Sequence, residues 1–160
     1  MNTLIVVNSH KGNTRRIAEA IADRLKRHGC SEVVDVESAA STIWGDVDLL
    51  FVGGPTEGHG MTPEMRGYLD GLASSSVRGR PVAAFDTRLG WPRILSGSAG
   101  DAIAARLARL DATVIGPVGS FIVTSAPALE QGELERAREW AESIAARALR
   151  ETALVEPVAV

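Results

Sequence analysis

Apolar residues come in short unbroken runs along this chain, and each run is followed by a stretch with helical spacing. The runs at Leu4–Val7 and Leu49–Val52 show no alternation of apolar and polar residues. A strand without alternation has both faces buried, as in a parallel sheet covered by helices on each side. We therefore predict five parallel strands, the last resuming after a Gly-Pro break, at Thr3–Asn8, Glu32–Val36, Leu49–Gly53, Pro81–Asp86 and Ala112–Ile115 with Phe121–Thr124.

The helical stretches between these strands carry boundary signals. Thr62-Pro63-Glu64 has the form of an N-cap, a proline at the first helical position and an acid in the first turn. Ser98 to Asp101 has nearly the spacing of a capping box. The last helix is expected to turn inward the residues Leu134, Ala137, Ala141, Ile144 and Ala148. Strands that alternate with helices predict an α/β fold built from βαβ units.

Composition narrows the classes of function. With 45% hydrophobic residues, 23% charged residues and a net charge of -3, the chain has no basic field that favours nucleic acid. The single cysteine, Cys30, excludes an internal disulfide and a multi-cysteine metal site. No leader sequence and no apolar run of bilayer-spanning length is found, which predicts a cytoplasmic location and no membrane partner. The 160 residues predict a single domain over 1–150 and a C-terminal tail over 151–160.

The most informative segment joins the first strand to the first helix. Ser9–Thr14 is a short polar turn that contains Gly12, and the helix after it carries Ile17, Ala18 and Ile21 on one face. Backbone N–H groups at a helix start have no partner within the helix and lie at the positive end of the macrodipole, so a phosphate fits there. A plain capping turn is the alternative, but a cap needs one short polar residue and this loop offers several.

Three loops are expected to meet at one edge of the sheet. In an open parallel sheet, ligands bind beyond the carboxyl ends of the strands, where the strand order reverses. The loops that follow the first, third and fourth strands are Ser9–Thr14, Gly53–Met61 and Thr87–Arg93. The second has four glycines in nine residues, which is costly in chain entropy and unusual for a plain connector. Glycines there let the backbone approach a flat ring closely.

These segments resemble the flavodoxin-like family of FMN-binding proteins over Met1 to about Arg150. Ser9-His10-Lys11-Gly12-Asn13-Thr14 is similar to the Ser/Thr-x-Thr-Gly-Asn-Thr phosphate loop of the family. Asp46–Gly54 followed by Pro55-Thr56 is similar to its third strand and ring loop. The resemblance implies a flavodoxin-like three-layer α/β/α sandwich with a five-stranded parallel sheet of order 2-1-3-4-5. It also implies FMN at the switch between the first and third strands.

The resemblance further implies three groups of cofactor-binding residues. The phosphate group would be held by Ser9, His10, Lys11, Gly12, Asn13 and Thr14. The isoalloxazine ring would be bordered by Pro55, Thr56, Glu57, Gly58, His59 and Gly60. Its other side would be covered by Thr87, Arg88 and Trp91. No residue of the chain is assigned a catalytic or metal-binding role.

The departures from the family pattern bear on function. Lys11 stands where a threonine is usual, and the loop after the fourth strand offers Arg88 and Arg93 in place of the acidic, tyrosine-bearing sequence of electron-carrying flavodoxins. A simple counterpart of those carriers is therefore not expected. Trp91 either forms an aromatic wall against the ring or packs under its own loop. His59 either approaches the flavin or is an exposed loop histidine.

The remaining side chains in and around these loops have milder alternatives. Glu57 either accepts a hydrogen bond from the flavin or is exposed, and His10 is expected to be exposed. Trp44 and Trp140 are expected to be packing residues. A receiver domain needs acids after the first and third strands, and Asn8-Ser9 and Gly53-Gly54 stand there instead.

The resemblance implies an FMN-binding protein that acts in electron transfer, as a carrier or as an FMN-dependent oxidoreductase. Gly58 and Gly60 could each turn a neighbouring carbonyl toward flavin N5 and stabilise a one-electron-reduced ring. The alternative enzyme is an NAD(P)H-linked reductase of quinone-type substrates. The non-enzyme alternative is a binding or regulatory domain of the same fold without FMN. The expected partner is a redox protein or a small-molecule electron acceptor, and the chain is expected to be a monomer or a homodimer.

Overall fold

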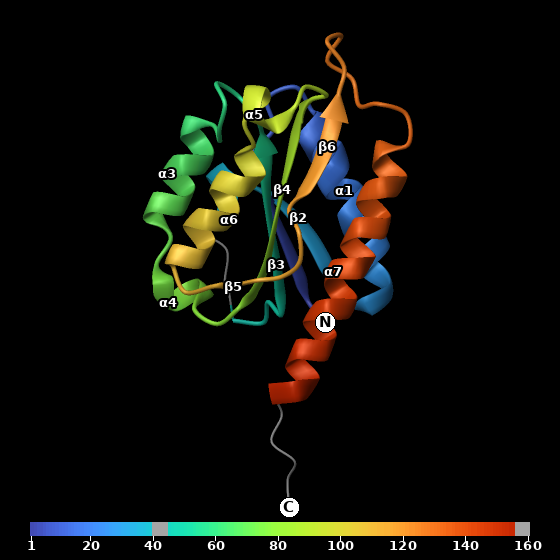
Figure 1. Ribbon diagram of the computed structural model, residues 1–160. Coiled ribbons are helices and arrows are strands. Elements are labelled where there is room, and N and C mark those ends of the chain that lie inside the picture. The colour runs from blue at the N-terminus through green and yellow to red at the C-terminus, as the bar shows by residue number, and fades with distance from the viewer. Residues whose placement is uncertain (40–44, 156–160) are drawn as a thin grey trace, which may run out of the picture.

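One parallel sheet forms the centre of the computed structural model, which describes residues 1–39 and 45–155 (Figure 1). The strands lie in the order β2-β1-β3-β4-β5, and β6 pairs with β4 beyond the end of β5. Their bounds are β1 (Thr3–Val7), β2 (Ser31–Asp35), β3 (Leu49–Pro55), β4 (Pro81–Leu89), β5 (Thr113–Val114) and β6 (Gly119–Val123). The predicted order is thus confirmed, with the fifth position filled by the two segments on either side of the predicted break.

Two strands run further at their carboxyl ends than the sequence predicts. β3 continues to Pro55 and β4 to Leu89, so the expected boundaries at Gly53 and Asp86 were wrong. The cause is tertiary pairing, because β6 lies in parallel register with the end of β4, and Pro55 pairs with Thr87. These partners supply backbone hydrogen bonds to a polar segment that the hydrophobic pattern alone assigns to a loop.

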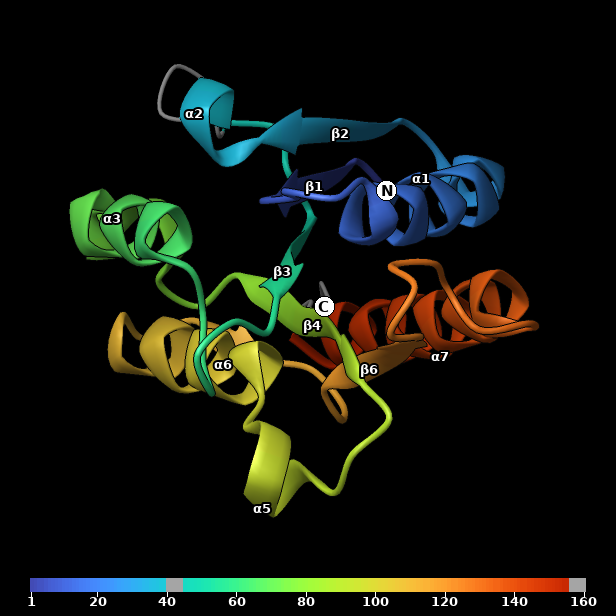
Figure 2. The same ribbon diagram turned by 90° about the horizontal axis from the view of Figure 1, so that it is seen from above.

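Helices cover both faces of the sheet. Figure 2 shows α1 and α7 on one face and α3 and α6 on the other. The helical elements are α1 (Asn13–Leu25), the 3₁₀ turn η1 (Lys26–His28), α2 (Val36–Ala39), α3 (Pro63–Gly71), α4 (Ser74–Val77), α5 (Arg93–Ser96), α6 (Ala99–Arg109) and α7 (Glu133–Val155). The predicted three-layer sandwich is therefore present.

The core divides into one cluster for each face. Side chains of a strand alternate between faces, so Ile5 of β1 packs with the α1 and α7 side, whereas Leu4 and Val6 pack with the α3 and α6 side. Both faces of β1 and of most of β3 are buried. Unbroken apolar runs in the sequence are the direct consequence of this two-sided burial.

Small residues of α7 let this helix lie close to the sheet. Ala137, Ala141 and Ile144 are fully buried as predicted, and Leu134 is half-buried. Trp140 meets three aromatic rings at centroid distances of 5.5 to 6.2 Å, those of Phe51, Phe85 and Phe121. The prediction that Trp140 is a packing residue is confirmed. The prediction for Trp44 falls on residues outside those described.

Both predicted helix starts are present. The Thr62 hydroxyl accepts a hydrogen bond from the N–H of Met65 at 3.2 Å, and that of Ser98 accepts from the N–H of Asp101 at 3.1 Å. Helix α7 extends to Val155, so residues 151–155 of the predicted tail are helical, and 156–160 lie outside the described residues. Within the described part of the chain, no helix is long and apolar enough to cross a membrane.

Candidate functional site

The start of α1 lies at the carboxyl end of β1 and presents unpaired backbone donors. Gly12 occupies the cap position with φ of 82°, a left-handed conformation that favours glycine. Gly12 has no side chain that could cap the helix, and Ser9 Oγ accepts a hydrogen bond only from the N–H of Arg15, the third residue of α1, at 3.2 Å. Among the described residues, no acceptor contacts the N–H of Asn13 or Thr14. An anion fits such a helix start.

The side chains of Asn13 and Thr14 are buried and tie this loop to two others. Asn13 Nδ2 donates to the carbonyl of Pro127 at 3.0 Å, and the hydroxyls of Thr14 and Thr87 lie 2.7 Å apart. The first contact reaches the loop after β6, and the second reaches the end of β4. These two side chains therefore shape the site, and the free donors at this point are the backbone amides.

A cavity of about 320 Å³ opens between these loops, and we call it the carboxyl-edge cavity. It brings together predicted residues from all three loops, namely Lys11, Asn13, Thr14, Pro55, Thr56, Glu57, Thr87 and Arg88. Its lining also includes Leu89, which lies in the predicted loop Thr87–Arg93 but had no role assigned, and four residues that the sequence analysis missed, which are Val123, Thr124, Ser125 and Pro127. The segment 123–127 follows the last strand, so the rule that ligands bind at the carboxyl ends of strands could have found it.

The other predicted residues do not line this cavity. Ser9, His10, Gly12 and Gly60 lie outside its lining. A neighbouring cavity of about 190 Å³, which we call the side cavity, is lined instead by Gly58, His59 and Trp91 together with Thr56, Arg88, Leu89, Leu95 and Ser96. Thr56, Arg88 and Leu89 line both cavities. The two spaces therefore share one wall.

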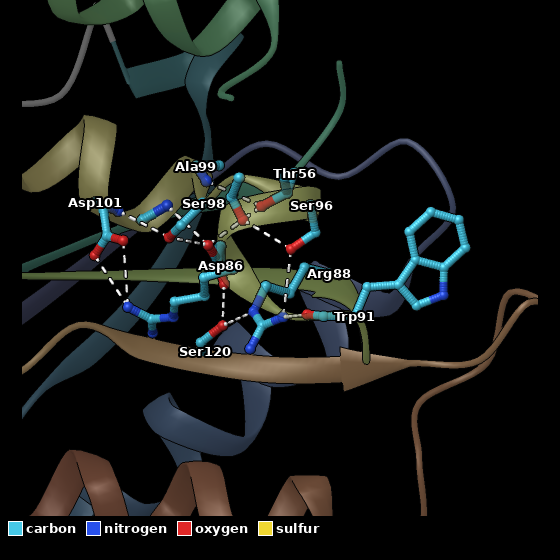
Figure 3. A network of polar contacts seen from close by, with 12 residues as sticks. Thr56, Asp86, Arg88, Trp91, Ser96, Ser98, Ala99, Asp101 and Ser120 are labelled. Atoms are coloured by element: carbon cyan, nitrogen blue, oxygen red, sulfur yellow. Dashed lines mark hydrogen bonds and ion pairs between the residues drawn. The ribbon is translucent and has the colours of Figure 1, made fainter. Parts of the chain in front are cut away.

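Trp91 does not pack under its own loop. Its side chain is 62% exposed and points away from the neighbouring polar network (Figure 3). Leu89, Ile94 and Leu95 are also exposed, so four large apolar residues lie in the open within seven positions. This exposed segment borders the side cavity through Leu89, Trp91 and Leu95.

The loop after β3 closes in a tight turn. The backbones of Glu57 and Gly60 exchange two hydrogen bonds, and Gly58 and His59 between them have φ of 54° and 70°. Positive φ at both central positions defines a type I′ turn. Gly60 was expected to supply this freedom, but His59 takes the left-handed conformation instead. Gly97 packs so closely that a Cβ on it would lie 2.0 Å from the carbonyl oxygen of His59.

His10 links the loop after β1 to the loop after β3. Its Nδ1 lies 2.9 Å from the Glu57 carboxylate, and its Nε2 lies 3.4 Å from Glu64 at the start of α3. The hydrogen bond to Glu57, aided by the charge of Glu64, holds the pKa of His10 above its ordinary value. The imidazole is exposed, as the sequence predicts. The Glu57 carboxylate is therefore hydrogen-bonded to His10, and Glu57 also lines the carboxyl-edge cavity.

The end of β4 carries a polar network that the sequence analysis missed (Figure 3). Asp86 is fully buried, and its carboxylate accepts hydrogen bonds from Thr56, Ser98, Gly100 and Ser120. Arg88 Nε donates to Ser120 Oγ at 2.7 Å. The local signal was a lone Asp at the end of an apolar run, and no pattern showed which donors would surround it.

A larger cavity of about 560 Å³ lies elsewhere, beside α2, α3 and α4. None of the predicted site residues lines it. Its lining includes Ala39, next in sequence to residues 40–44, which lie outside the described chain. The converging donors and charges lie at the carboxyl edge, so size alone does not make the larger space the site.

The chain is similar to known flavodoxins in sequence and fold. A family model described as a flavodoxin domain matches residues 4–90. The solved structure of a flavodoxin from the domain Archaea is 20% identical with a TM-score of 0.72, and the match covers 93% of this chain and 99% of that one. The solution structure of two-electron reduced Megasphaera elsdenii flavodoxin is 28% identical with a TM-score of 0.64, covering 87% and 97%.

Similarity also extends to part of a larger enzyme. Rubredoxin oxygen:oxidoreductase from Desulfovibrio gigas is 19% identical with a TM-score of 0.71, and the match covers 95% of this chain but 37% of that one. At such identity the likeness concerns the fold. No match was found among curated proteins.

Proposed function

Because this chain belongs to the flavodoxin family, whose members bind FMN, its cofactor is FMN, and we propose that FMN binds in the carboxyl-edge cavity and serves electron transfer. The observation that carries the proposal is the uncapped start of α1, where the free N–H groups of Asn13 and Thr14 lie beside Lys11 in the lining of that cavity. A phosphate group is the ligand that such a cradle favours.

The lining fits both ends of FMN. Lys11 and the amides at the start of α1 would hold the phosphate. Pro55, Leu89 and Val123 supply apolar surface for a flat ring, and Thr56 adds a polar group beside it. When bound, FMN supplies reversible one- and two-electron redox chemistry, while the residues of the chain hold it and control access to the ring.

The charges of the lining favour an anionic ligand. The charged residues that line the cavity are Lys11, Arg88 and Glu57, and the carboxylate of Glu57 is hydrogen-bonded to His10. Two cations against one engaged acid suit a phosphate dianion, and they also favour the reduced flavin because it carries more negative charge. The loop after the fourth strand is acidic in electron-carrying flavodoxins. In this chain the corresponding segment contributes Arg88 to the lining.

The side cavity favours a second candidate, an NAD(P)H-linked reductase with a small-molecule electron acceptor. It shares Thr56, Arg88 and Leu89 with the carboxyl-edge cavity, so a ligand in it would lie next to bound FMN.

If the protein is an electron carrier, it would instead bind a redox partner protein. The exposed side chains of Trp91, Ile94 and Leu95 give such a partner an apolar contact beside the cofactor. A cytoplasmic location stays a prediction from the sequence.

Binding of FMN and of riboflavin to the purified chain tests the proposal. We expect a stoichiometric flavin spectrum with FMN and affinity for riboflavin at least about tenfold weaker, because riboflavin lacks the phosphate. Gly12→Ala should weaken FMN binding, since its φ of 82° is strained for alanine, and should leave riboflavin binding nearly unchanged.

A matched control is Gly132→Ala, at a residue with φ of 87° in the turn before α7 and outside the lining of either cavity. It carries the same backbone strain and should not alter the preference for FMN over riboflavin. A colourless chain that ignores added FMN contradicts the proposal. Equal affinity for the two flavins contradicts the assignment of the phosphate to α1.

A further inference from the structure

We propose that Asp86 and Ser120 are positioning residues for Arg88. Held by them, Arg88 fixes the position of a positive charge in the wall that the two cavities share. The inference rests on the proposed function, because the cofactor that this wall faces is FMN. It concerns two buried or half-buried polar residues for which the family pattern gave no role. Its support is a chain of hydrogen bonds from buried Asp86 through Ser120 to Arg88 (Figure 3), and Arg88 lines both cavities.

Asp86 is a carboxylate without contact to water. Its exposed fraction is 0%, and among the described residues no cation forms an ion pair with it. A buried carboxylate is costly unless hydrogen bonds replace its hydration. Such bonds come from three segments, through Thr56 at 3.2 Å, Ser98 at 2.6 Å, Gly100 N–H at 3.0 Å and Ser120 at 2.6 Å.

Strand geometry places the relay on one face of the sheet. Asp86 and Arg88 are two residues apart in β4, so their side chains leave the same face. The register of β6 sets Ser120 directly opposite Asp86. The Ser120 hydroxyl donates to Asp86 Oδ1 at 2.6 Å and accepts from Arg88 Nε at 2.7 Å. Because a carboxylate only accepts and a guanidinium only donates, the hydroxyl has a single orientation.

The far end of Arg88 holds the segment that leads into α5. One terminal nitrogen, Nη1, donates to the carbonyls of Leu89 at 3.1 Å and Trp91 at 2.6 Å and to the Ser96 hydroxyl at 3.4 Å. Arg88 and Leu89 line both cavities. If Arg88 were displaced, the segment from Leu89 to Ser96 would therefore lose these three hydrogen bonds.

Stability alone does not account for this arrangement. A buried polar cluster contributes little stability relative to apolar packing of the same volume. Here its hydrogen bonds end on a cation that faces the cofactor site, and no other described residue of the lining except Lys11 carries a positive charge. The arrangement thus fixes where a charge lies relative to FMN, which is a property of the site.

A double-mutant cycle on Ser120 and Arg88 tests the inference, with FMN affinity read from the quenching of flavin fluorescence. Ser120→Ala alone should weaken FMN binding about tenfold, because it removes one charge-assisted hydrogen bond from Arg88. Arg88→Ala should weaken it by at least as much. Adding Ser120→Ala to Arg88→Ala should change the affinity by less than about twofold, because the residue through which Ser120 acts is then absent.

Two further readouts separate positioning from general stability. Ser120→Thr keeps the hydroxyl and should restore affinity to within about threefold of the natural chain. The midpoint potential of bound FMN should become more negative in Arg88→Ala and, by a smaller amount, in Ser120→Ala, because each removes or displaces a cation beside the reduced ring. Ser143→Ala, at an exposed serine of α7, is the matched control and should alter neither quantity.

The outcomes are distinguishable. If Ser120→Ala weakens binding equally with and without Arg88, Ser120 does not act through Arg88 and the inference is overturned. The same holds if Ser120→Ala lowers only the urea midpoint of unfolding and leaves affinity and potential unchanged. A natural chain that binds no FMN contradicts the proposed function itself, and the inference falls with it.

Discussion

At the scale of single residues, the site is defined by side chains that bind other loops of the protein. Thr14 contacts Thr87, Asn13 contacts Pro127, and His10 contacts Glu57. Each of these bonds spans at least 47 positions of sequence. The loop Ser9–Thr14 is therefore held in place by its neighbours before any ligand arrives, which lowers the ordering cost of binding.

The His10 link is sensitive to pH, and its sign follows from the direction of the pKa shift. A raised pKa in the folded state means that the bonds of protonated His10 to Glu57 and Glu64 are fully present below the unfolded pKa, near 6.5. They are lost as the pH rises through the higher folded value. The link should thus be closed in mildly acidic solution and open in alkaline solution.

We expect a pH titration of the His10 ring by NMR to give a pKa above the ordinary value in the natural chain. In Glu57→Gln the pKa should move back toward that value, because the hydrogen bond that His10 donates to the Glu57 carboxylate is the largest cause of the shift. Glu64→Gln is the matched control and should cause a smaller change, since that carboxylate is 3.4 Å away rather than 2.9 Å. A larger effect of Glu64→Gln would contradict the assignment.

Residues also mark the limit of what the sequence could predict. Glycine, asparagine and threonine after an apolar strand predict a strand-turn-helix unit with free backbone donors, because this geometry depends on neighbouring residues alone. Asp86 gave no such signal, since its partners Thr56, Ser98 and Ser120 are brought to it only by the folded sheet. Histidine is one of the non-glycine residues that adopt positive φ more readily, but with a glycine on each side nothing in the local sequence assigned the φ of 70° to His59.

At the scale of elements, the helix starts were predictable and the strand ends were not. Caps depend on residues within one turn, and both Thr62 and Ser98 cap as expected. Strand ends depend on pairing across the sheet, so β4 extends to Leu89 because β6 lies beside it. The extension matters for the site, because it sets Arg88 opposite Ile122 and places its side chain beside Ser120.

The start of α3 is joined to the end of β1 through the side chain of Thr62. The buried Thr62 hydroxyl caps α3 through Met65 and also donates to Asn8 Oδ1 at 2.6 Å, at the end of β1. Thr62→Ala should lower the free energy of unfolding in urea by about 2 kcal/mol. The substitution removes the cap and leaves Asn8 Oδ1 without the hydrogen bond that the Thr62 hydroxyl donates.

Two variants control for this effect. Thr62→Ser keeps the hydroxyl and should cost less than about 1 kcal/mol. Thr152→Ala, at an exposed position of α7, should change the free energy of unfolding by no more than about 0.5 kcal/mol. If Thr62→Ser destabilises the chain as much as Thr62→Ala, the packing of the residue and not its hydroxyl is responsible.

At the scale of the whole molecule, fold and site have different origins. The two-sided core explains the unbroken apolar strands, and these predicted the sheet and its layers. The carboxyl-edge cavity instead joins the start of α1, the ends of β3 and β4, and the segment 123–127. The family resemblance singled out only the first three of these parts, although the rule that ligands bind at the carboxyl ends of parallel strands could also have indicated the segment 123–127.

Because the cavity joins four parts of the chain that are distant in sequence, bound FMN should stabilise the molecule as one unit. A ligand that binds only the folded state adds about 2.7 kcal/mol to the free energy of unfolding at a hundred times its Kd. We therefore expect FMN to raise the urea midpoint of the natural chain without changing the slope m, since the surface exposed on unfolding is nearly the same.

Riboflavin at the same concentration should raise the urea midpoint less, because it has no phosphate group to bind the backbone amides at the start of α1. Gly12→Ala should respond alike to both flavins, for the strained cap distorts that cradle. A midpoint that FMN and riboflavin raise equally in the natural chain would place the binding energy on the ring alone and remove α1 from the site.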